Sequence, residues 1–150
     1  LGRGLAKGDV MASRHHPEYP ARCSAEDVCS AAIHPRNIEV RVWRGPQWRE
    51  FSETERGMFF GNRWTVTSHL DRMGVRLTGA AIPAPPAIMP SEPVLPGSVQ
   101  ITGGGEPVVT MRDGPTVGGY PKIAWLDEEA CLRMAQVPPG GTVDFRPPDE

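Results

Sequence analysis

The chain has 150 residues, the size of one ordinary domain and enough to bury a hydrophobic core. Hydrophobic residues make up 39% and charged residues 23%, so the composition does not indicate disorder, and no stretch approaches the roughly 20 apolar residues that span a bilayer. We therefore expect no membrane partner. A formal net charge of -2 argues against a surface that neutralises phosphate backbones, so we expect no nucleic acid partner.

Residues 1–37 are the least strand-like part of the chain, with one weak helix candidate over residues 24–32. The chain opens with Leu1, and Gly4 to Met11 resembles the inside of a domain, so we expect a partial chain whose first 37 residues end a preceding half-domain and form a connector. The three cysteines are an odd number without a secretory leader, which indicates a reducing, cytoplasmic location.

A metal site in this segment is the less favoured alternative. The residues to consider are His15, His16, Cys23, Cys29 and His34. Zinc ligands are typically paired two to four residues apart, and the two cysteines are spaced more widely. We therefore expect a flexible connector and no metal.

The remainder is predicted to be mainly β. Glycine and proline, 17 of each, fall between short apolar segments, as in a chain of many short strands and turns. In Ile38 to Val42, apolar and charged residues alternate, which places three apolar side chains on one face of a strand. The predicted strands are Ile38–Trp43, Trp64–Thr67, Val75–Thr78, Val99–Thr102, Val108–Met111, Ile123–Leu126 and Val143–Arg146.

Two short helices interrupt the strands. Ser52 and Glu55 have the spacing of a capping box, in which the hydroxyl and the carboxylate each accept from a backbone amide, and apolar residues follow. Asp127 is placed to cap a second helix, which ends before Pro138.

Two glycine- or proline-rich segments are predicted to be loops. Residues 82–96 hold six prolines, which donate no amide to a sheet, so an extended surface loop is expected. Gly103 to Gly105 joins two strands with no helix after it, which favours a hairpin turn over a phosphate cradle.

An ordered series of motifs carries a family resemblance. The segments are Arg44-Gly45-Pro46-Gln47, Phe51-Ser52, Trp64 to Ser68, Asp71 to Gly79, Ser91-Glu92, Gly97 to Gln100, Gly105 to Val109 and Gly118 to Ala124. In this order they resemble the biotin-dependent carboxyltransferase family, which includes the 5-oxoprolinase C-subunit, KipA and allophanate hydrolase subunit 2. The series covers about two-thirds of the chain, and its order is more specific than any single motif.

The resemblance implies a cyclophilin-like β-barrel with two or three short helices. The complete family domain has two halves, and residues 38–150 are expected to be its C-terminal half. It implies a component of an ATP-dependent enzyme for small amides or ureas, inactive alone, with a KipI-like partner of the B-type and an ATP-binding partner of the A-type. ATP or carboxybiotin is implied for the complex, and neither is assigned to this chain. The alternative is a KipA-like regulatory module that binds its partner without catalysis.

The first candidate site is Gly118-Gly119-Tyr120-Pro121-Lys122. The two glycines allow backbone amides to approach a carboxylate or phosphate, whose charge Lys122 offsets. A tight turn into the next strand is the structural alternative. Thr116 belongs to the preceding run, where this chain departs from the polar sequence usual in the family.

The second candidate group is Asp71, Arg72 and Arg76, expected at the start of a strand with Asp71 and Arg72 on opposite faces. Paired arginine donors suit a substrate carboxylate, and a solvated face with a surface ion pair is equally compatible with the spacing. Gln100 is expected to face away from its apolar neighbours, where its amide matches a urea-like substrate if that face lines the barrel mouth.

Catalytic residues are not assigned. Glu92 and Asp113 are the carboxylates nearest these motifs and are candidates for a general base or a substrate anchor. Ser68, His69 and Asp71 are residue types of a catalytic triad, but neighbours along one strand cannot converge on a substrate, so a triad is rejected. We expect the glycine pair before Tyr120 and the arginines after Asp71 to meet at one barrel opening.

Overall fold

The computed structural model describes residues 7–8, 35–85 and 89–147. The chain divides into two compact units, residues 1–33 and 34–150. In the first unit the described residues, Lys7 and Gly8, form a turn. The helix predicted over residues 24–32 and the metal ligands considered for this segment lie outside the described residues.

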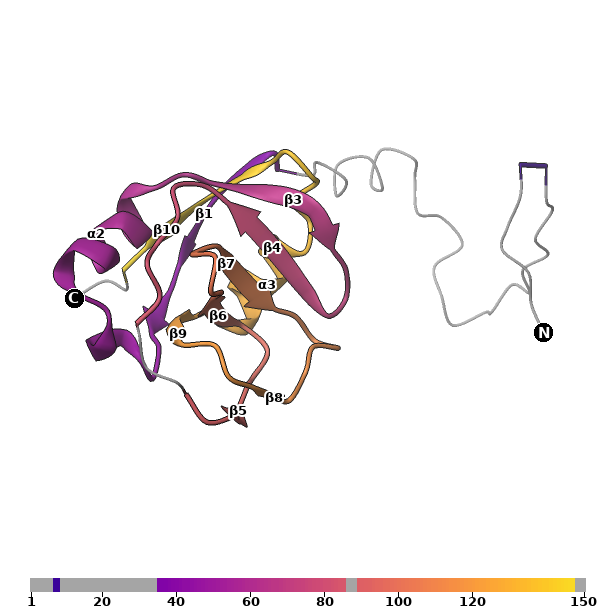
Figure 1. Ribbon diagram of the computed structural model, residues 1–150. Helices are drawn as coiled ribbons and strands as arrows, with labels where there is room; N and C mark the ends of the chain where they lie inside the picture. Colours follow the sequence, from indigo (N-terminus) through magenta and orange to yellow (C-terminus); the bar gives the residue numbers. More distant parts are fainter. Residues whose placement is uncertain (1–6, 9–34, 86–88, 148–150) are drawn as a thin grey trace. The chain divides into compact units, whose positions relative to one another are not determined.

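The second unit is a β-barrel. Its strands are β1 (Asn37–Arg41), β2 (Trp43–Arg44), β3 (Trp64–Leu70), β4 (Gly74–Thr78), β5 (Glu92–Pro93), β6 (Ser98–Ile101), β7 (Pro107–Thr110), β8 (Val117–Gly118), β9 (Lys122–Trp125) and β10 (Thr142–Arg146). Eight of them form one sheet in the order β1-β10-β3-β4-β7-β6-β9-β2. The short strands β5 and β8 pair with each other and lie apart from the barrel strands (Figure 1).

One short segment closes the barrel. Strand β1 pairs in parallel with β10, and β2 pairs antiparallel with β9 at the other end of the sheet order. Between them, Val42 donates its amide to the carbonyl of Arg146 at 2.9 Å, and we call this junction the seam. The two ends of the sheet are therefore consecutive in the chain, and the sheet is a nearly closed barrel, which confirms the predicted mainly β barrel fold. The single strand predicted over Ile38–Trp43 is two strands, because the segment changes partners at Val42.

The predicted alternation in β1 is confirmed and fills the barrel. Ile38, Val40 and Val42 are at most 5% exposed, whereas the charged residues between them are exposed. In the same core, the Phe59 and Phe145 rings stack with centroids 4.7 Å apart, and both side chains are fully buried. Burying a side chain of this size contributes about 1.5–3 kcal/mol, so the apolar inner face is the main source of the barrel's stability.

Both predicted helices are confirmed, with their caps. In α2 (Glu53–Gly61) the Ser52 hydroxyl accepts from the Glu55 amide at 3.3 Å, and the Glu55 carboxylate accepts from the Ser52 amide at 2.6 Å. In α3 (Glu128–Met134) the Asp127 carboxylate accepts from the Ala130 amide at 2.8 Å. A 3-10 helix, η1 (Trp48–Glu50), was not predicted. Among the described residues, no helix is long and apolar enough to cross a membrane.

The loop predictions are confirmed only in part. Gly103 to Gly105 form a turn between β6 and β7, closed by the Gly105 amide donating to the Thr102 carbonyl at 2.9 Å. Within the proline-rich residues 82–96, however, β5 pairs Glu92 with Gly118 of β8. The Val94 amide, directly after Pro93, donates to the Thr116 carbonyl at 2.9 Å, so a proline in this segment does not prevent it from pairing.

Candidate functional site

A partly buried ion pair marks one end of the barrel. Lys122 is the first residue of β9, and its side chain is only 4% exposed. Its Nζ donates to Oε1 of Glu92, the first residue of β5. The same oxygen accepts from Nε2 of Gln47 at 2.9 Å. We call these three residues the lysine cluster.

Gln47 reaches the cluster because the chain after β2 lies against β9. The Gly45 amide donates to the Ile123 carbonyl at 3.0 Å, and the Gln47 amide donates to the Lys122 carbonyl at 3.2 Å. A Cβ at Gly45 would lie 2.2 Å from the Lys122 carbonyl oxygen, so only glycine permits this approach. The Gln47 side chain then connects the two halves of the ion pair: its Oε1 accepts from the Lys122 amide at 3.0 Å while its Nε2 donates to Glu92.

Gln100 adds a second amide to the same end. It is the Cα partner of Lys122 across β6 and β9, so the two side chains share one face of the sheet, and Gln100 is only 6% exposed. Its Nε2 donates to the Thr110 hydroxyl of β7 at 2.9 Å. A Cβ at Gly118 would lie 3.2 Å from Gln100 Oε1, so the glycine backbone passes close over this oxygen. The core cluster of the barrel is apolar, and these polar groups gather beneath β5 and β8.

The glycine motif and the predicted site residues nearest to it divide between these buried contacts and the surface. The structure brings Glu92, Gln100, Gly118 and Lys122 together through these contacts. Tyr120 is 51% exposed, and Gly119 and Thr116 are also exposed. These three residues lie on the outer rim of the same end.

The second predicted group lies in a turn. Asp71 Oδ1 accepts from the Met73 amide at 2.8 Å and the Gly74 amide at 3.0 Å, so the carboxylate stabilises the bend between β3 and β4. The prediction that Asp71 and Arg72 start a strand on opposite faces is wrong, because β4 begins at Gly74 and the two residues precede it. Arg72 pairs with Asp113 at 2.5 Å in an exposed ion pair.

Arg76 does not share a ligand site with Arg72 in this arrangement. It lies within β4 and forms a half-exposed ion pair with Glu106 at 3.5 Å. The two arginines therefore each have a carboxylate partner of their own, and both ion pairs are solvated.

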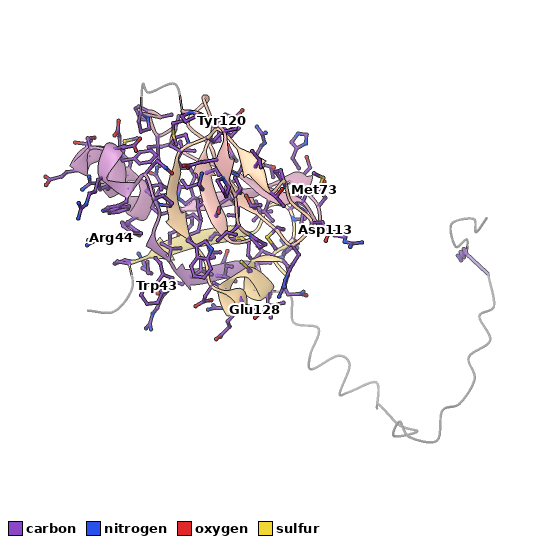
Figure 2. All side chains as sticks on the ribbon, turned by 90° about the horizontal axis from the view of Figure 1, so that it is seen from below. Trp43, Arg44, Met73, Asp113, Tyr120 and Glu128 are labelled. Atoms are coloured by element: carbon purple, nitrogen blue, oxygen red, sulfur yellow. The ribbon has the colours of Figure 1, made fainter. Side chains whose placement is uncertain are left out.

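A groove of about 760 Å³ runs between this turn and α3. Its walls are mainly apolar and include Val75, Met111 and Leu132, and the Arg112 guanidinium pairs with Glu128 at its rim. Neither this groove nor a shallower cavity of about 420 Å³ beside Arg76 is lined by residues of the lysine cluster. Figure 2 shows Tyr120 apart from Met73 and Asp113, which lie at the Asp71 turn, and neither of these two cavities joins the two predicted groups.

Cys131 lies in the groove and is half-buried. Burial raises the pKa of its thiol, and the neighbouring Asp127 carboxylate raises this pKa further. The thiol is therefore protonated at neutral pH. In residues 7–8, 35–85 and 89–147, no group of three or more His, Cys, Asp or Glu side chains is placed to hold a metal ion.

Two residues of the site have little signal in the sequence. Gln47 is indicated only by its place at the end of Arg44-Gly45-Pro46-Gln47. Glycine and proline after a strand predict a tight turn there, but they do not predict where the Gln47 side chain points. Thr110 looks like an ordinary strand residue. What distinguishes both residues is that they are polar and yet buried. Burial of a polar residue can be predicted only once the order of the strands is known.

The fold places the chain among the β-barrel domains, here with an apolar core and a small group of buried polar side chains beneath β5 and β8. The family described as "Carboxyltransferase domain, subdomain A and B" matches residues 1–147, and the chain belongs to this family.

Individual relatives agree with this membership. The chain is 35% identical over 145 residues to the 5-oxoprolinase C-subunit of Haemophilus influenzae, covering 96% of this chain and 45% of the relative. It is 36% identical over 107 residues to the 5-oxoprolinase C-subunit of Escherichia coli, covering 71% of this chain and 34% of the relative. The crystal structure of the K. lactis urea amidolyase superposes with a TM-score of 0.68 at 28% identity, covering 77% of this chain and 8% of that one. The chain thus spans less than half the length of these relatives.

Proposed function

We propose that this chain contributes a ligand-binding barrel to a multi-component enzyme that processes small amides or ureas, of the 5-oxoprolinase or carboxyltransferase type. The observation that carries the proposal is the polar end of the barrel, where Glu92, Gln100 and Lys122 converge beneath Gly118. An amide side chain can both donate to and accept from an amide group, and a carboxylate accepts from its N–H. The names of the two 5-oxoprolinase relatives support the same class of substrate.

The partners proposed for the complex are a KipI-like protein of the B-type and an ATP-binding protein of the A-type, with ATP or carboxybiotin entering through the complex. An exposed apolar patch on the barrel supports a protein partner. Trp43 is 53% exposed beside its cross-strand neighbour Trp125, which is 36% exposed, and Leu132 is 62% exposed. Exposed large apolar side chains that gather on one face commonly mark a protein interface.

The experiment is reconstitution of the complex followed by an assay of ATP hydrolysis that depends on 5-oxoproline. We expect no turnover by this chain alone and turnover with both partners present. Gln100→Leu keeps the volume and removes the amide, so it lowers 5-oxoproline-dependent turnover about tenfold or more, whereas the exposed Gln136→Leu leaves it unchanged. An absence of turnover with every reconstituted partner set counts against an enzyme.

The second candidate function is a KipA-like regulatory module. The same patch around Trp43 favours it, because a module of this kind requires only a protein-binding face. It predicts a stable complex with the KipI-like protein and no turnover under any condition. Co-purification followed by the ATPase assay separates the two functions, since only the enzyme gives both the complex and hydrolysis.

A further inference from the structure

The two carboxylate oxygens of Glu92 have different surroundings. Both donors in the lysine cluster, Lys122 Nζ and Gln47 Nε2, donate to Oε1. Oε2 receives neither of them. The Glu92 side chain is 31% exposed and the Lys122 side chain 4% exposed, so of the two charged groups the carboxylate is the one that meets a ligand.

The lysine is therefore poorly placed to bind an anion. Its ammonium is buried and already neutralised by Glu92, and a ligand carboxylate would have to displace that partner. The expected role of Lys122 in offsetting a ligand's charge is replaced by a role in holding Glu92.

A second acceptor lies beside Glu92. Gln100 uses its Nε2 to donate to Thr110 at 2.9 Å, which leaves its Oε1 directed toward Gly118. Gly118 is in turn the cross-strand partner of Glu92. Glu92 Oε2 and Gln100 Oε1 are thus both hydrogen-bond acceptors, and the groups that complement acceptors are N–H donors.

We propose that Glu92 is the residue that binds the ligand's N–H group, through Oε2, and that Gln47 and Lys122 are positioning residues that hold Oε1. The inference rests on the proposed function, because it concerns the same barrel end. Gln47 is the residue that links this geometry to β9: its backbone is bound to that strand, and its side chain fixes the rotamer of Glu92. A charge-assisted hydrogen bond of this kind is stronger than one between neutral groups.

The test compares two probes by calorimetric titration of the full chain and of the reconstituted complex: 5-oxoproline, which has a lactam N–H, and N-methyl-5-oxoproline, which lacks it. We expect Glu92→Gln to weaken 5-oxoproline binding about tenfold or more and to leave binding of the N-methyl analogue within about twofold. The matched control is Glu106→Gln, which also removes a carboxylate from an ion pair but lies with Arg76 at another part of the barrel. It leaves both affinities unchanged.

The positioning role of Gln47 is tested by a double-mutant cycle. Gln47→Met keeps the side-chain volume and removes both hydrogen bonds, so it weakens 5-oxoproline binding in the native background and has no further effect when Glu92 is already Gln. A purely structural contribution weakens binding equally in both backgrounds. If Glu92→Gln does not fold because Lys122 is left unpaired, the double variant E92Q K122M removes both charges and serves in its place.

The outcomes separate the two proposals. Equal affinity of the native protein for both probes, or a Glu92→Gln variant that binds 5-oxoproline as tightly as the native protein, overturns the role of Glu92 and leaves the proposed function standing. Failure of both probes to bind the native chain and the complex overturns the proposed function, and the inference with it.

Discussion

Replacing Gly45 with alanine tests the contact on which both the closure of the barrel and the lysine cluster depend. The added Cβ would lie 2.2 Å from the Lys122 carbonyl oxygen and 2.8 Å from the Ala124 amide nitrogen. Both are backbone atoms of β9, so no side-chain rotation relieves the overlap. To reach the 3.4 Å of ordinary contact, the chain must move by about 1.2 Å, the difference between 3.4 and 2.2 Å.

This movement stretches two backbone hydrogen bonds, from Gly45 to Ile123 and from Gln47 to Lys122, which are already 3.0 and 3.2 Å long. Overpacking costs about 1–3 kcal/mol and each of the two weakened hydrogen bonds about 0.5–1.5 kcal/mol, so we expect Gly45→Ala to lower the free energy of unfolding by about 2–6 kcal/mol. For a chain of this size, about 2–4 °C is lost per kcal/mol, which gives a fall in Tm of at least about 4 °C.

The assay is thermal unfolding followed by circular dichroism, with Gly57→Ala as the matched control. Gly57 lies within α2, and a Cβ there meets nothing within 4 Å. Alanine is favoured over glycine in a helix interior by about 0.5–1 kcal/mol, so the control is expected to raise Tm. A Gly45→Ala protein that melts at or above the native Tm would refute the reasoning, because the strand would then accommodate the methyl group without loss.

Two further predictions concern α2 and the groove. Ser52→Ala removes half of the capping box and is expected to lower the free energy of unfolding, measured by urea titration, by about 1 kcal/mol. Replacement of the nearby exposed Thr54 by alanine should have little effect. Identical unfolding curves for the two variants would contradict the capping contribution. Because its thiol pKa is raised, Cys131 should react with iodoacetamide at pH 8 more slowly than a cysteine in a short peptide, measured in a background where the other cysteines are serine. Asp127→Asn retains the helix cap and removes the negative charge, so it lowers that pKa and speeds the reaction; an unchanged rate would show that the carboxylate does not act on Cys131.

Local patterns account for the elements that the sequence predicts well. The alternation in Ile38 to Val42 and the caps at Ser52 and Asp127 depend on residues within a few positions of each other, and all three are confirmed. The barrel itself follows from the number of short strands and from the family resemblance.

The parts that sequence does not reveal depend on pairing between distant residues. Glu92 and Gly118 belong to two short strands that pair with each other across 26 positions of sequence. Each strand has only two residues, which is too short to show a periodicity. The burial of Lys122 depends on Gln47, which is 75 residues away in sequence. The charged residues near Asp71 led to a wrong prediction of where the strand begins, because a carboxylate that caps a turn and one that starts a strand look alike in sequence.

The seam at Val42 has a consequence for the order in which the protein is made. It unites strands from opposite ends of the described barrel, as the hydrogen bond between Asn37 and Thr142, 105 positions apart, illustrates. Until residue 146 has emerged from the ribosome, β1 lacks its partner strand β10. Contacts between residues so far apart in sequence are associated with slow folding. During translation, the open edge of β3 is consequently available to strands of other nascent chains until β10 arrives to occupy it.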